Sequence, residues 1–148
     1  MPRAPFQVLV ILYRKTKNAV EYCVFERADP PGQLQFVAGG GEDDETHMQA
    51  AIRELREETG ITDAKMMPLK SVTSIPSEIF TAEMRKHWEK DRYIIPEYAF
   101  GAEVGCADKI TLSDEHVAYK WLTFIQAKAA LKWDGNKTAL YELNCVLS

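Results

Sequence analysis

The segment from Gly39 to Ile61, GGGEDDETHMQAAIRELREETGI, constrains the fold of this chain more than any other part of the sequence. Three consecutive glycines lead into a stretch, Thr46 to Thr59, that contains no glycine or proline and is rich in strong helix formers. Gly60 follows at the place where many helices end in a left-handed residue. The segment therefore predicts a glycine-rich loop that leads into one helix of about four turns.

This helix is expected to have an apolar face and an adjoining acidic face. Glu54, Glu57 and Glu58 are three and four residues apart, so they stand on one side, and Arg53 can pair with Glu57. Such an oxygen-rich cluster suits Mg²⁺ or Mn²⁺, although a solvated acidic face with Arg–Glu pairs is the simpler interpretation. The apolar residues recur at helical steps and predict packing on a core: Met48, Ala51, Ile52, Leu55 and Thr59.

The glycines favour the metal-site interpretation, because they let the backbone approach a phosphate or a metal closely. The spacing G-x5-E-x7-R-E-U-x-E-E-x-G-U, with U aliphatic, is that of the Nudix box, and the chain resembles the Nudix hydrolases. The resemblance implies an α/β fold, an α/β/α sandwich whose mixed sheet carries a central catalytic helix. It also implies metal-dependent attack of water on phosphorus, which splits a diphosphate bond.

The resemblance further implies a role for each matching residue. Glu54, Glu57 and Glu58 hold Mg²⁺ or Mn²⁺, and the carbonyl of Gly39 joins the metal shell. Glu54 is also a candidate base, and Arg53 orients the glutamates, so that Arg53, Glu54 and Glu57 are the candidate catalytic residues.

Two positions depart from the usual form of the box. Gly41 replaces an aliphatic residue, and Asp44 stands where a glycine is common. Neither is a metal ligand in the pattern, so activity is not excluded. Asp44 is expected to adopt a left-handed conformation, which Asp tolerates better than most residues.

A second segment, Asp114 to Leu122, resembles the E-H-x-A-Y-K-W-L stretch of dihydroneopterin triphosphate pyrophosphohydrolases, also described as dATP pyrophosphohydrolases. The match implies that Glu115 is a further metal ligand rather than an ordinary exposed acid. Arginines suit bidentate phosphate contacts, although without the match Arg3 and Arg27 are ordinary surface cations. The predicted substrate-binding residues are Arg3, Arg27, Ala38, Gly40, Glu78, Ile79 and Phe80.

Other segments supply the strands and helices of a mixed α/β domain. The pattern predicts strands at residues 6–13, 21–26, 34–37, 69–75, 97–104 and 116–123, with further helices at 125–133 and 136–146. Asn136 is the expected cap of the last helix, and residues 78–91 are ambiguous. No repeat or linker divides the sequence, so residues 1–148 are expected to form a single Nudix domain.

The composition limits the partners of this chain. Its net charge of −4 gives no general basic surface, so the expected partner is a small phosphorylated molecule and not a nucleic acid polymer. Three cysteines without close spacing predict free thiols, and neither a signal peptide nor a membrane segment is recognisable. We therefore expect a cytoplasmic protein, monomeric or homodimeric. The three tryptophans are expected to pack in the core, with stacking on a purine or pterin ring as the alternative, and no histidine has a metal-ligand spacing.

The sequence leaves several functions open. The leading hypothesis is hydrolysis of a nucleoside triphosphate or related compound, such as dihydroneopterin triphosphate or dATP, to a monophosphate and pyrophosphate. A hydrolase of dinucleoside polyphosphates and an inactive nucleotide-sensing Nudix module are the alternatives. A Nudix-fold isomerase of prenyl diphosphates is disfavoured, because no cysteine matches its catalytic one.

Overall fold

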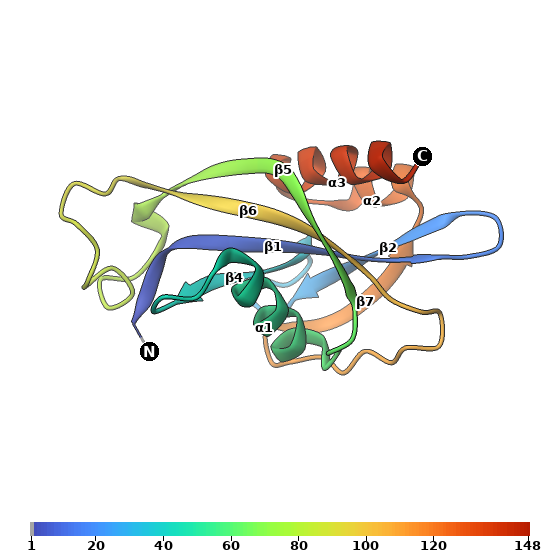
Figure 1. Ribbon diagram of the computed structural model, residues 1–148, viewed down its shortest axis with the longest axis horizontal. Coiled ribbons are helices and arrows are strands. Elements are labelled where there is room, and N and C mark those ends of the chain that lie inside the picture. Colours follow the sequence, from blue (N-terminus) through green and yellow to red (C-terminus); the bar gives the residue numbers. More distant parts are fainter. Residues whose placement is uncertain (1) are drawn as a thin grey trace.

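The computed structural model describes residues 2–148 and shows a seven-stranded mixed sheet with helices on both faces (Figure 1). The predicted α/β class is confirmed. The strands are β1 (Arg3–Lys15), β2 (Val20–Arg27), β3 (Leu34–Gln35), β4 (Val37–Glu42), β5 (Lys65–Pro76), β6 (Ile94–Glu103) and β7 (His116–Leu122). The helices are α1 (His47–Thr59), α2 (Phe124–Ala130) and α3 (Asp134–Leu147), with a short 3₁₀ helix, η1 (Ser77–Ile79).

Strand β1 organises the sheet. It pairs antiparallel with β2 and β4 and parallel with β6, and the principal strand order is β3-β2-β1-β6-β5. Strand β7 pairs with β2 and so enters the same sheet. The apolar run predicted at residues 6–13 is therefore the centre of the sheet, and it is buried because both of its faces are covered.

Alternate residues of β1 belong to two separate cores, because successive strand residues point to opposite faces. Val8 and Val10 pack with Ala51 and Leu55 of α1. Leu9 and Ile11 pack on the other face with residues of α2 and α3, among them Ala127, Leu140 and Leu143. Figure 1 shows the same arrangement, with α1 on one side of the sheet and α2 and α3 on the other.

Helix α1 begins with a capping box. The Thr46 hydroxyl accepts a hydrogen bond from the backbone N–H of Gln49, and the Gln49 side chain accepts one from the N–H of Thr46. Gly60 ends the helix in the left-handed conformation, as predicted, with φ of 78°. The predicted apolar face was wrong at Ile52, whose side chain is 42% exposed, and Ala50 is buried. The helix is thus rotated slightly, toward the side that buries Glu58.

Several predicted boundaries were wrong for local reasons. The strand predicted at 34–37 is two strands with a break at Phe36, and β5 begins four residues earlier than expected. The glycines predicted as a loop lie inside β4, because Gly39 and Gly40 pair with Val8 and Gln7 of β1. Pro96 lies inside β6, and residues 80–93 form turns after η1. Asn136 is not the cap of α3: Trp133 holds that position, and Asn136 is buried within the first turn.

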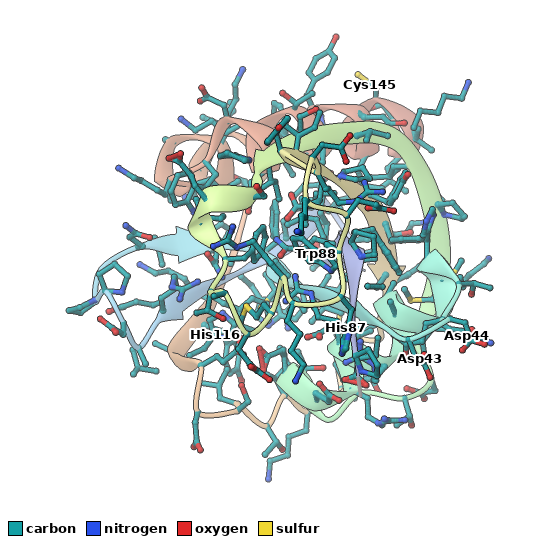
Figure 2. The ribbon with its side chains drawn as sticks, turned by 90° about the vertical axis from the view of Figure 1, so that its left-hand side faces the viewer. Asp43, Asp44, His87, Trp88, His116 and Cys145 are labelled. Carbon is teal, nitrogen blue, oxygen red and sulfur yellow. The ribbon has the colours of Figure 1, made fainter. Side chains whose placement is uncertain are left out.

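No helix of the described chain is long and apolar enough to cross a membrane. Cys23, Cys106 and Cys145 are all free thiols, as predicted. Cys23 is buried, and Cys145 lies on the outer side of α3 (Figure 2).

Candidate active site

Arg53 connects the glycine strand β4 to the acidic face of α1. Its Nε and Nη2 donate to the two carboxylate oxygens of Glu45 at 2.8 and 3.0 Å, and Nη2 also donates to the carbonyl of Gly40 at 2.7 Å. Its Nη1 donates to Glu54 at 3.0 Å and to Glu57 at 3.2 Å. One guanidinium group therefore holds β4, the loop residue Glu45 and the carboxylates of Glu54 and Glu57 in fixed positions relative to one another.

The three consecutive glycines are needed for space. A Cβ atom on Gly39 would overlap the carboxylate of Glu54, and one on Gly40 would overlap the guanidinium of Arg3. Gly39 and Gly40 are adjacent in β4, so they open toward opposite faces of the sheet. Glu54 and Arg3 thus approach the same short stretch of backbone from its two sides.

The departures of the box from its usual form have a steric explanation. A Cβ atom on Gly41 would overlap the ring of Phe6, so an aromatic side chain from β1 fills the place of the usual aliphatic residue. The left-handed residue of the loop is Asp43, with φ of 51°, and the prediction of Asp44 was wrong. The N–H of Asp43 donates to the carbonyl of Pro2 at 2.7 Å, which holds this turn in place. Asp43 and Asp44 are both exposed on the loop before α1 (Figure 2).

Glu54 is largely buried, with 12% of its side chain exposed. Burial raises the pKa of Glu54 to about 7, although the charge and hydrogen bond of Arg53 oppose the shift. Desolvation disfavours the charged form of a carboxyl group, and here it outweighs the nearby cation. The group is therefore able to take up or release a proton near neutral pH.

Glu58 is buried at the other side of the cluster, with 3% of the residue exposed. Its Oε1 accepts a hydrogen bond from the Ser113 hydroxyl, while Oε2 is buried without a hydrogen-bond partner. Nδ1 of His116 lies 3.9 Å from that oxygen, and burial lowers the pKa of His116. The neighbouring carboxylate of Glu58, together with burial, raises the pKa of Glu115 to about 7.

These carboxylates converge but do not surround a single point. Among residues 2–148, no three His, Cys, Asp or Glu side chains form a complete metal-coordinating group, and Glu57 is 48% exposed. The donor set nevertheless fits a hard divalent cation: all its atoms are oxygens, and Oε2 of Glu58 is buried without a partner. An unpaired buried carboxylate oxygen is costly, and a bound cation would remove that cost.

Arg3 lies beside the glycines, on the face of β4 opposite to the one that Glu54 contacts. Its Nη2 donates to Oε1 of Gln7 at 3.1 Å, and its guanidinium lies 5.0 Å from the ring centroid of Phe80. Its Nε is buried and has no hydrogen-bond partner. Burial lowers the pKa of Arg3, and the carboxylate of Glu54 opposes that shift. A buried, unpaired donor of this kind is suited to an anionic ligand.

A cavity of about 540 Å³ opens next to these groups. Of the predicted substrate-binding residues, Arg27, Ala38 and Ile79 line it, as does Glu115. Glu78 is exposed and does not line the cavity, and Phe80 packs under Arg3 instead. The structure thus brings most of the predicted residues together, while Glu78 lies apart from them.

The comparisons with known proteins agree with this geometry. The model of the NUDIX domain matches residues 4–143. The chain belongs to the Nudix family. It is a Nudix pyrophosphohydrolase. Nudix hydrolases act on small phosphorylated substrates and generally use divalent metal ions.

Two bacterial relatives are both named dihydroneopterin triphosphate diphosphatase. The chain is 29% identical over 140 residues to the dihydroneopterin triphosphate diphosphatase of Escherichia coli strain K12, which covers 93% of this chain and 91% of that protein. It is 32% identical over 135 residues to the diphosphatase of the same name from Haemophilus influenzae, with 90% and 83% covered.

Solved structures extend the likeness to three dimensions. A NUDIX hydrolase from Listeria monocytogenes is 42% identical with a TM-score of 0.85, and 97% of this chain and 94% of that one are covered. The Escherichia coli dihydroneopterin triphosphate pyrophosphohydrolase superposes with a TM-score of 0.76 at 25% identity, covering 97% and 99%. The α/β/α Nudix fold expected from the sequence is confirmed.

The Nudix box did not reveal the polar lining of the cavity. Gln7, Gln35, Glu97 and Asn136 line it from four different elements, and Trp133 lies at its edge, 49% exposed rather than packed in the core. One signal was present in the sequence, since Gln7 interrupts an otherwise apolar run. The other residues are separated by up to 101 positions and are brought together only by the fold.

Proposed function

We propose that this chain hydrolyses dihydroneopterin triphosphate or a related nucleoside triphosphate, in a metal-dependent reaction that releases pyrophosphate and a monophosphate. The observation that carries the proposal is the position of the cavity. It shares Glu115 with the carboxylate site and is also lined by Arg27, and its volume of about 540 Å³ lies in the range of small-molecule sites. A substrate bound there would extend its phosphates toward the glycines.

The residues that would hold Mg²⁺ or Mn²⁺ are Glu54, Glu57, Glu58, Glu115 and the carbonyl of Gly39. When bound, the cation would neutralise the diphosphate and lower the pKa of a coordinated water molecule. The remaining chemistry belongs to the side chains of this chain.

Glu54 is the proposed general base. A pKa of about 7 lets its carboxylate accept a proton from the attacking water near neutral pH, and the proton is then lost to solvent. Arg53 positions this base, because its guanidinium holds Glu54 and the Gly40 carbonyl in one hydrogen-bonded group. Arg53 is therefore a positioning residue in this proposal.

The cationic side of the substrate site is supplied by Arg3 and Arg27. The unpaired Nε of Arg3 beside Gly40 would donate to a phosphate oxygen, and Arg27 lies at the cavity next to Glu115. These two guanidinium groups would hold the negative charge that develops on the departing pyrophosphate.

The substrate class rests on the relatives. Two proteins at 29% and 32% identity bear the name dihydroneopterin triphosphate diphosphatase. A net charge of −4 favours a small phosphorylated substrate over a nucleic acid polymer. We further propose that residues 1–148 act as one domain in the cytoplasm.

The decisive experiment is a substrate panel with Mg²⁺ that contains dihydroneopterin triphosphate, dATP, a dinucleoside polyphosphate and a 5′-triphosphorylated RNA. We expect pyrophosphate and a monophosphate from dihydroneopterin triphosphate. In Glu57→Gln and Glu58→Gln the rate of hydrolysis should fall by roughly 100-fold or more. Mutation of residues that only hydrogen-bond to a metal ligand already costs about 10- to 100-fold in metal affinity or activity. Glu83→Gln, an exposed glutamate outside the site, is the matched control.

Circular dichroism and thermal unfolding would establish that each variant is folded. Full activity of both Glu57→Gln and Glu58→Gln would overturn the metal-site assignment. Binding without hydrolysis of any member of the panel would instead favour a nucleotide-sensing module, and preferred cleavage of the dinucleoside compound would replace the proposed substrate.

A further inference from the structure

Three polar side chains on the floor of the cavity have no part in the hydrolytic steps. Gln35, Glu97 and Asn136 are each more than nine-tenths buried, with 7%, 7% and 5% exposed, and all three line the cavity. Most buried polar side-chain atoms have at least one hydrogen-bond partner. Polar atoms of these side chains that lack a protein partner and face an open cavity therefore indicate a polar ligand.

The hydrogen bonds fix which atoms are free. Gln7 accepts from Arg3 through Oε1 and donates from Nε2 to Oε2 of Glu97 at 2.7 Å. Oε1 of Glu97 then has no partner among the described residues. Asn136 accepts from the N–H of Phe36 through Oδ1 at 3.0 Å, so its free group is the Nδ2 donor. The floor thus offers a carboxylate acceptor and a separate amide donor.

The carboxylate lies in line with the glycines of the box. Gln7 is paired across the sheet with Gly40 on one side and with Glu97 on the other. Directly paired residues of neighbouring strands share a face, so these three residues form one row. Two strand spacings, about 10 Å, separate Gly40 from Glu97. That separation leaves room for a sugar or short polyol between the phosphates and a ring.

We propose that Glu97 recognises the ring N–H and exocyclic amino group of a 2-amino-4-oxo heterocycle, a guanine or pterin ring, and so selects such substrates over adenine nucleotides. The inference deepens the function proposed above and rests on it. The two adjacent N–H donors of such a ring match a carboxylate: one donates to the free Oε1 of Glu97, and the other donates to the remaining lone pair of Oε2, which also accepts from Gln7. Adenine presents a ring acceptor beside its amino group, and this acceptor would face the carboxylate unfavourably.

The rest of the cavity is consistent with a planar ring. Phe36, Ile79 and Trp133 line it, and Ile79 and Trp133 are exposed at its edge, 64% and 49% respectively. Apolar and aromatic surfaces of this kind pack on the faces of a heterocycle. The Nδ2 group of Asn136 is then available to the 4-oxo oxygen.

The test compares kcat/KM for dGTP, dITP, dATP and dihydroneopterin triphosphate in the wild type and in Glu97→Gln. dITP keeps the ring N–H of dGTP but lacks the exocyclic amino group, so the order expected for the wild type is dGTP, then dITP, then dATP. In Glu97→Gln the values for dGTP and dihydroneopterin triphosphate should fall by roughly 10- to 100-fold, the equivalent of a hydrogen bond to a charged group. The value for dATP should rise, because the free amide N–H of the glutamine introduced at position 97 would donate to the ring acceptor of adenine.

The matched control is Glu103→Gln, which removes a carboxylate from the same strand outside the cavity. Gln at position 97 can still accept from Gln7, so the variant is expected to fold. An unchanged order of substrates in Glu97→Gln would overturn the inference and leave the hydrolytic function intact.

A second measurement does not depend on hydrolysis. Binding of neopterin, followed by its fluorescence in metal-free buffer, should be weakened roughly 10-fold or more in Glu97→Gln. If the wild type hydrolysed nothing, the proposed function would fail, and weakened neopterin binding in the variant would still support the role of Glu97. Equal binding by the two proteins would refute it.

Discussion

Gly39 and Gly40 are adjacent in sequence, but a different side chain packs against each of them. The missing side chain of Gly39 makes space for the Glu54 carboxylate, and that of Gly40 makes space for the Arg3 guanidinium. Neither residue has a positive φ, so the requirement at both positions is close approach and not backbone conformation.

Replacing Gly39 by alanine should therefore damage the site more than the fold. The added Cβ would push Glu54 out of its position beside Arg53, and misplacement of a reacting group by about 1 Å can cost roughly 100-fold in rate. We expect a loss of that order in kcat on the preferred substrate, with thermal unfolding measured in parallel.

Gly105→Ala is the control for this substitution. A Cβ atom there would meet only Asp108 at an ordinary 3.6 Å, and the residue lies outside the site. Its activity should equal that of the wild type. Wild-type kcat in Gly39→Ala would show that the position of Glu54 is unimportant.

Single-residue conformations could be predicted only in part. The left-handed Gly60 follows from its place after a helical pattern, and the structure has it there. The left-handed turn residue before the helix was assigned to Asp44 but is Asp43. The choice depends on a hydrogen bond from Asp43 to Pro2, which is distant in sequence and carries no local signal.

Helices α1 and α2 both begin with a capping box. Each has a threonine cap and a glutamine three residues later, joined by reciprocal hydrogen bonds: Thr46 with Gln49, and Thr123 with Gln126. Only α1 carries the residues of the Nudix box. The two helices therefore allow the effect of a cap on stability to be separated from its effect on the site.

Thr46→Ala and Thr123→Ala should each lower the free energy of unfolding by about 1 kcal/mol, measured by urea denaturation. Only Thr46→Ala should also reduce kcat, because fraying of the first turn of α1 would loosen the loop that ends at Glu45 and so disturb the Glu45–Arg53 hydrogen bonds. Equal activity of the two variants would mean that the hydrogen bonds of Arg53 hold the loop without the cap.

Element types were predictable where a periodic pattern is long. The central strand and the box helix follow from unbroken apolar and helical patterns, and both are present. The break between β3 and β4 was missed, because the Phe36 N–H bonds to Asn136, 100 residues away, rather than to a strand. The same contact explains why Asn136 lies inside α3 and does not cap it.

For the molecule as a whole, the site gathers negative charge from separate parts of the chain. Glu54, Glu57 and Glu58 come from α1, and Glu115 from the segment before β7. The pKa values of Glu54 and Glu115 are both raised to about 7, with burial and nearby carboxylates among the causes. Folding without a cation therefore brings like charges together at a cost.

A divalent cation should consequently stabilise the whole fold. At ten times its dissociation constant, Mg²⁺ would add about 1.4 kcal/mol, which corresponds to a rise in Tm of about 3–6 °C for a domain of this size. The measurement is thermal unfolding in EDTA and in Mg²⁺, with NaCl at equal ionic strength as the salt control.

Glu58→Gln serves as the variant control, since it removes a charge from the cluster. Its Tm should depend less on Mg²⁺ than that of the wild type. An equal rise in Tm for both proteins, or no rise above the NaCl value, would contradict the proposed position of the cation.

The carboxylate side of the site was predictable because it is local: its helix residues and glycines lie within 23 consecutive positions. The cavity was not predictable in this way. Gln7, Gln35, Glu97 and Asn136 come from β1, β3, β6 and α3, and their neighbourhood exists only after the sheet and α3 have assembled.

Strand β4 has Glu54 on one face and Arg3, in contact with the Gln7–Glu97 row, on the other. Bond cleavage and ring recognition are thus assigned to parts of the molecule that can mutate independently. A descendant or an engineered variant could acquire a new substrate through changes at positions 35, 97 and 136 while residues 39–61 remain untouched. Because the two sets of residues are separate, related enzymes could keep the same hydrolytic reaction while their substrates differ.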